Sequence, residues 1–181
     1  MSITCPQRPV AVLFVCLAAA SFAPAAEVSV DFVAGIADDA PTLDGRIEPA
    51  EWRDAMRIDG FGPDPRRARG YVLATKTHVY LAVASELPAE GRLLAKVDKP
   101  TAKMIFDDSI EVWIDPAPAA RAGRRYQLMT NRLGRRWSRF HARGGEAEDV
   151  SYRATWKTAN GEHDGWWHCE MAVELASLAK G

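Results

Sequence analysis

Four side chains on two expected neighbouring strands have residue types and spacing suited to ligand binding. Because side chains alternate between the two faces of a strand, Glu111 and Trp113 share one face of the first strand. By the same rule, Gln127 and Asn131 share one face of the second strand. If the two faces coincide, a carboxylate and two amides surround an indole ring. This combination fits a sugar, whose C–H surface stacks on an aromatic ring and whose hydroxyl groups hydrogen-bond to polar side chains.

The same residues also have structural interpretations. Trp113 can belong to the core, with Glu111 hydrogen-bonding groups of the scaffold, so that the patch binds nothing. Asp107 and Asp108, just before the first strand, are candidate Ca²⁺ ligands because Ca²⁺ prefers carboxylate oxygens. No calcium-loop motif surrounds them, and the expected role of Asp108 is therefore to cap a turn or the start of the strand.

The rest of the chain predicts an all-β fold. Short alternating segments are separated by turn residues about every ten positions, which is typical of an antiparallel β-sandwich with jelly-roll or immunoglobulin-like layers. We expect one short N-terminal helix, opened by Pro49 and carrying an apolar stripe of Trp52, Ala55 and Met56. The expected strands cover residues 27–34, 70–76, 79–85, 109–114, 125–131, 135–140, 150–158 and 166–173, with a turn at Asn160-Gly161.

Composition limits the partners and the covalent cross-links. The 181 residues suffice for one domain with a substantial core, and the formal net charge of −1 favours neither a nucleic acid nor an anionic membrane surface. Of the three cysteines, Cys5 and Cys16 lie in the N-terminal segment that we expect to be removed. Cys169 alone cannot form an intramolecular disulfide, and its place in an apolar strand predicts a buried, inert thiol.

The N-terminus has the features of a signal peptide. Arg8 precedes an apolar run at residues 10–23, which is too short to span a bilayer as a helix. The run ends in a small-x-small cleavage motif, Ala23-Pro24-Ala25. We therefore expect residues 1–25 to be removed on export.

Removal of this segment leaves residues 26–181 as one secreted or periplasmic domain. The alternative is a lipoprotein anchored at Cys16, although Val15 stands where lipoprotein processing needs a small residue. No other segment is apolar enough to cross a membrane, so we expect no stable membrane insertion.

Five sequence blocks follow one another in the order that they have in a known family. They are LDGRIEPAEWRDA (43–55), THVYLAVASE (77–86), FDDSIEVWIDP (106–116), YQLMTN (126–131) and GWWHCEMAVELASL (165–178). On these blocks the chain resembles the family 9 carbohydrate-binding modules (CBM9) of the DOMON-like β-sandwich superfamily. The resemblance implies a non-catalytic, sugar-binding sandwich of a kind often attached to secreted glycoside hydrolases.

The chain departs from the family pattern at several positions. Members usually continue beyond the last block with strands that carry a sugar-binding asparagine and aromatic residue, so we expect a sandwich without its last strands here. The aromatic clamp that members can carry before the Asp-Asp-Ser motif is Ile105 or Phe106, and Met129 replaces the family's arginine. Among the family's direct sugar ligands, Glu111 has a clear counterpart.

The sequence thus predicts an exported carbohydrate-binding module, not an enzyme, that binds a polysaccharide or oligosaccharide such as a glucan or xylan during carbohydrate catabolism, without a cofactor. Two alternatives remain open. Some DOMON-like domains bind b-type haem between a methionine and a histidine or lysine, and the candidate ligands here are Met129, Met104, Met56, His141 and His168. The second alternative is an interaction module that has lost its ligand.

Overall fold

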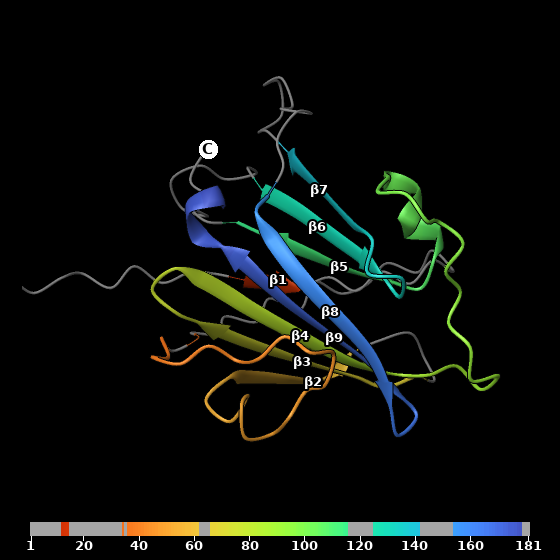
Figure 1. Ribbon diagram of the computed structural model, residues 1–181, viewed down its shortest axis with the longest axis horizontal. Coiled ribbons are helices and arrows are strands. Elements are labelled where there is room, and N and C mark those ends of the chain that lie inside the picture. Colours follow the sequence, from red (N-terminus) through yellow and green to blue (C-terminus); the bar gives the residue numbers. More distant parts are fainter. Residues whose placement is uncertain are drawn as a thin grey trace, which may run out of the picture.

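The computed structural model describes residues 12–14, 34, 36–61, 66–115, 125–141 and 154–178. Two antiparallel sheets stack as a β-sandwich, which confirms the predicted fold class (Figure 1). The first sheet has the order β1 (Val12–Phe14), β5 (Ser109–Ile114), β6 (Arg125–Asn131) and β7 (Arg136–His141). The second has the order β2 (Met56–Phe61), β3 (Ala68–Ala74), β4 (His78–Glu86), β9 (Trp166–Glu174) and β8 (Trp156–His163).

Helical structure is limited to two short 3₁₀ turns among the described residues. They are η1 (Ala102–Phe106), which precedes β5, and η2 (Leu175–Leu178), which follows β9. The second turn forms the end of the last of the five sequence blocks. In the described part of the chain, no helix is long and apolar enough to cross a membrane.

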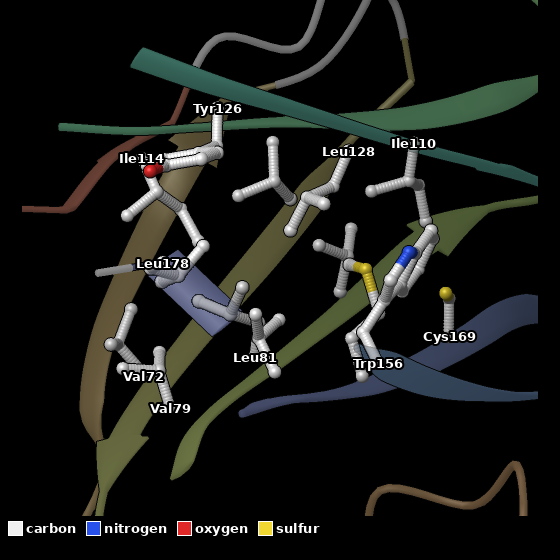
Figure 2. Close-up of a cluster of buried hydrophobic side chains, with 14 of the residues drawn as sticks. Val72, Val79, Leu81, Ile110, Ile114, Tyr126, Leu128, Trp156, Cys169 and Leu178 are labelled. Atoms are coloured by element: carbon white, nitrogen blue, oxygen red, sulfur yellow. The ribbon is translucent and has the colours of Figure 1, made fainter. Parts of the chain in front are cut away.

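One apolar core fills the space between the sheets. Ile110 and Ile114 of β5 belong to the same buried cluster as Leu81 of β4, and Figure 2 shows their side chains in the space between the two sheets. All three are almost completely buried, and each such side chain stabilises the fold by about 1.5–3 kcal/mol through removal from water. Trp167 joins this core and Trp166 does not, because successive side chains of a strand point to opposite faces.

Cys169 lies in the same core and has no exposed surface. Burial raises the pKa of its thiol to about 12, because a thiolate would lose its hydration there. The predicted burial is confirmed, and the thiol is protonated at neutral pH. The Thr158 hydroxyl oxygen Oγ1 lies 3.5 Å from the Cys169 Sγ.

A loop formed by residues 36–55 covers part of the outer face of the second sheet, where Trp52 packs on Leu73 and Ala172. Beneath the loop, Glu170 has no exposed surface. Its Oε1 accepts a hydrogen bond from Trp52 Nε1 at 3.1 Å, and its Oε2 accepts from the Gly45 backbone N–H at 2.8 Å. Burial raises the pKa of Glu170, although these hydrogen bonds favour its charged form.

The predicted N-terminal helix is wrong. Residues 49–55 form isolated turns, in which Glu51 N–H and Trp52 N–H both donate to the Glu48 carbonyl, and Met56 already begins β2. The spacing of the apolar stripe fits a helix, but its residues pack in different parts of the structure. Trp52 packs in the outer cluster under the loop, whereas Met56 packs against the main core.

The predicted turn at Asn160-Gly161 is also wrong. Both residues lie inside β8, and the chain turns later, at Asp164 and Gly165, which have positive φ angles of 50° and 81°. Gly161 is required for packing, because a Cβ atom there would lie 2.4 Å from the backbone oxygen of Gly45. This glycine therefore marks a close approach between two chain segments.

The remaining strand predictions agree with the structure. Two of them, at 27–34 and 150–158, lie partly outside the described residues. The strands predicted at 109–114 and 125–131 have the same bounds as β5 and β6. Of the strand predicted at 27–34, only Ala34 is described, and it is not in a strand. The strand predicted at 150–158 begins at Trp156 in the described part.

β1 lies within the predicted signal peptide. It pairs with β5 in antiparallel register, with Val12 opposite Ile114 and Phe14 opposite Val112. If cleavage occurs after Ala25, as the sequence predicts, β1 is lost and β5 becomes the edge of a three-stranded sheet. The four residues of the predicted sugar patch lie on β5 and β6 of this sheet and not on β1.

Candidate functional site

The predicted patch lies on the outer face of the first sheet. In the β5–β6 register Trp113 is opposite Gln127, and Ser109 is opposite Asn131, so all four predicted residues share a face as expected. The opposite side chains of these strands, including Ile110 and Val112, enter the core. β7 adds three further residues to the outer face, which are Trp137, Arg139 and His141.

A chain of hydrogen bonds joins three side chains across this face. Gln127 Nε2 donates to Glu111 Oε1 at 2.7 Å. His141 Nε2 lies 2.7 Å from Gln127 Oε1 and, because a carbonyl oxygen accepts, it is the donor. The His141 ring also packs against Trp113, with 4.7 Å between the ring centroids. The four side chains therefore hold one another in fixed positions.

Positive charge surrounds this cluster. The Arg125 guanidinium lies 5.0 Å from the centre of the Trp113 ring, in a cation–π contact. Partial burial lowers the pKa of His141, and the nearby charges of Arg139 and Arg125 lower it further. His141 is consequently neutral at pH 7, with its proton on the Nε2 atom that donates to Gln127.

Glu111 does not project into solvent as expected, because its residue is only 7% exposed. Met129 lies directly opposite it on β6, and Gln127 hydrogen-bonds to it from the same strand. Within the described residues, no donor hydrogen-bonds to the second carboxylate oxygen, Oε2. Among the described residues, the carboxylate is thus held in place through Oε1 alone.

Asn131 belongs to the scaffold and not to an accessible patch. Its residue has no exposed surface, and its Nδ2 donates to the Val97 carbonyl at 2.8 Å and to Asp107 Oδ2 at 2.9 Å. Its Oδ1 accepts from the Arg135 backbone N–H at 3.1 Å. These bonds occupy both ends of the amide, so Asn131 fixes the neighbouring loop and does not contact a sugar in the proposed site.

The two candidate calcium ligands hold a neighbouring loop. Asp107 accepts hydrogen bonds from the backbone N–H groups of Lys96 and Val97, and Asp108 accepts one from Leu94. Burial by itself would raise the pKa of Asp107, but these hydrogen bonds, with that from Asn131, lower it overall. In the described part of the chain, no three His, Cys, Asp or Glu residues cluster as metal ligands.

The candidate haem ligands are dispersed or already engaged. Met129 is buried between the neighbouring strands, and His141 uses Nε2 to hold Gln127. Met104 is buried in η1, and Met56 packs against the main core from the other sheet. His168, also on the other sheet, accepts a hydrogen bond at Nδ1 from the Ile47 backbone N–H at 3.1 Å.

Sequence reasoning missed the contribution of β7 to the site. The strand was predicted at 135–140, and alternation already places Trp137 and Arg139 on one face of it. The missing information was the pairing partner of the strand. The observed register sets Trp137 beside Met129 and Arg139 beside Gln127, so β7 extends the outer face that carries Glu111.

Comparison with known proteins gives a likeness in structure alone. No family model matches the chain, and no curated protein matches it. A CBM9 module from Caldicellulosiruptor kristjanssonii in complex with glucose has a TM-score of 0.55 at 14% identity, over 78% of this chain and 68% of that chain. The cellotriose complex from the same organism has a TM-score of 0.54 at 14% identity, over 78% and 66%.

A third solved structure gives a similar result. A putative carbohydrate-binding protein from Bacteroides uniformis has a TM-score of 0.55 at 15% identity, over 81% of this chain and 72% of that chain. At such low identities the likeness is one of fold. The chain is thus an all-β sandwich whose structure matches the family 9 carbohydrate-binding modules over about three quarters of its length.

Proposed function

We propose that this protein is an exported, non-catalytic carbohydrate-binding module that binds an oligosaccharide or polysaccharide, such as a glucan or xylan, in carbohydrate catabolism. The observation that carries the proposal is the cluster on the outer face of β5, β6 and β7. There Glu111, Gln127 and His141 are joined by hydrogen bonds next to the partly exposed Trp113 ring. The secreted or periplasmic location follows from the predicted signal peptide.

Each residue of the cluster has a definite role in this proposal. Trp113 provides the apolar surface on which a pyranose ring stacks. Glu111 accepts a sugar hydroxyl through Oε2, and a charged acceptor forms a stronger hydrogen bond than a neutral one. Gln127 and His141 position the carboxylate and the indole. The fold likeness supports this proposal, since the matched modules from Caldicellulosiruptor kristjanssonii bind glucose and cellotriose.

The composition of the outer face supports binding without hydrolysis. Glycoside hydrolysis ordinarily uses two carboxyl groups that flank the scissile bond, about 5–9.5 Å apart. Glu111 is the one acidic residue within the sequences of β5, β6 and β7. The proposed site therefore offers one carboxylate for hydroxyl recognition and no second carboxylate from these strands.

Calorimetric titration with soluble gluco- and xylo-oligosaccharides tests this function. We expect saturable binding to at least one series, and a loss of about tenfold in affinity for Trp113→Ala because the stacking surface is removed. Trp166→Ala is the matched control, since this partly exposed indole lies on the other sheet. Flat titrations up to millimolar sugar for every series would contradict the proposed function.

A further inference from the structure

A groove of about 380 Å³ runs beside β7, next to the proposed sugar site. Trp137 and Pro100 form part of its lining, together with Arg136 and the segment 154–156 that leads into β8. Trp137 also belongs to the outer face of the sheet, because it pairs with Met129 of β6. Trp137 therefore belongs both to the face that carries Glu111 and to the lining of the groove at the edge of the sheet.

The groove is built from groups that hold one another in place. The Arg136 guanidinium donates to the Trp156 backbone carbonyl and lies 5.8 Å from the centre of the Trp156 ring. The Ala154 backbone N–H donates to Ser138 Oγ at 3.1 Å. These contacts tie the segment before β8 to β7, so the groove exists before any ligand arrives. A preformed site loses less conformational entropy on binding.

The spacing of the two partly exposed indoles sets the size of the ligand. Trp113 pairs with Gln127, and Trp137 pairs with Met129, so the indoles lie two strands apart and two residues apart along the strands. With standard strand geometry, their Cα atoms are separated by about 12 Å along a diagonal of the sheet. That distance exceeds one pyranose ring and matches a short oligosaccharide.

We propose that the ligand is an extended saccharide chain that runs diagonally across the sheet from Trp113, past Gln127, to Trp137 and its groove. This inference rests on the proposed function and adds a second stacking platform to it. One sugar unit stacks on Trp113 beside Glu111, and a unit further along the chain stacks on Trp137. Continuity of the groove with the outer face favours a saccharide as its occupant, because the same chain reaches both.

A length series of one oligosaccharide, from monosaccharide to hexasaccharide, tests the extended site by calorimetry. For the wild-type protein, affinity should rise with length until the chain reaches both indoles and then level off. Trp137→Ala should weaken the longer members about tenfold and leave the shortest binding member within twofold. Trp137→Phe should recover most of the loss, because phenylalanine keeps an aromatic surface, and Trp166→Ala should leave the series unchanged.

The outcomes separate this inference from the function on which it rests. If no member of the series binds, both fail together. If short and long members bind with the same affinity and Trp137→Ala has no effect, the extended site is wrong and the module with a single platform stands. An equal loss of affinity for short and long members in Trp137→Ala also overturns the extended site. The Trp137 indole would then act through the fold, or through the sugar unit that stacks on Trp113.

Discussion

Replacing Glu111 with glutamine should weaken oligosaccharide binding by about tenfold or more. Glutamine keeps the length and shape of the side chain and retains an oxygen that can accept from Gln127. It removes the negative charge, and a hydrogen bond to a charged acceptor contributes about 1.5–3 kcal/mol, where each 1.4 kcal/mol corresponds to a factor of ten in affinity. Calorimetric titration with the best-binding oligosaccharide measures the loss.

A matched change on the other sheet controls for the loss of one charge. Glu86→Gln removes a carboxylate whose side chain is 23% exposed and which pairs with Arg67, away from the proposed site. It should leave the affinity unchanged. The free energy of unfolding of both variants shows whether the buried Glu111 position tolerates the change. Wild-type affinity in a folded Glu111→Gln protein would remove Glu111 from the sugar site.

Replacing Glu170 with glutamine should lower the free energy of unfolding by about 3 kcal/mol, because buried acceptors of several hydrogen bonds are costly to lose. The carboxylate accepts from the backbone N–H groups of Asp44 and Gly45 and from the Trp52 indole. Glutamine has one acceptor oxygen, so its amide N–H₂ would face at least one of these donors. Urea unfolding followed by tryptophan fluorescence measures the change.

An exposed glutamate on the adjacent strand provides the control for this variant. Glu162→Gln removes one partner of an ion pair with Arg132, whose side chains are 35% and 42% exposed. Surface pairs of this kind contribute about 0–1 kcal/mol. A destabilisation by Glu170→Gln no larger than that of Glu162→Gln would contradict the assignment of Glu170 as the residue that fixes the loop over the second sheet.

The sandwich could be predicted from the sequence because strand signals are local. β5 and β6 were predicted with their observed bounds, since apolar and polar side chains alternate through both. The helix after Pro49 could not be excluded in this way. Its apolar spacing fits a helix, and the competing interaction comes from Glu170, which lies more than a hundred residues later and binds Trp52. Tertiary contacts of this kind override local propensity.

The residue types of the candidate site could be predicted from the sequence, but the exposure of each side chain could not. Alternation correctly placed Glu111, Trp113 and Gln127 on one face. The burial of Glu111 and Asn131 depends on neighbours that sequence alone does not identify, namely the opposite residue on β6 and the loop held by Asp107. The contribution of β7 was missed for the same reason, because strand pairing is a long-range property of the fold.

The measurement that tests the central claim most directly is an NMR titration that follows the indole N–H resonances of the tryptophans. Adding the best-binding oligosaccharide should shift the resonances of Trp113 and Trp137, which lie on the outer face of the first sheet. The resonances of Trp52 and Trp166, which belong to the other sheet and its covering loop, should stay in place. Shifts confined to Trp52 or Trp166, or no shift at saturating sugar, would contradict a carbohydrate site on the β5–β7 face.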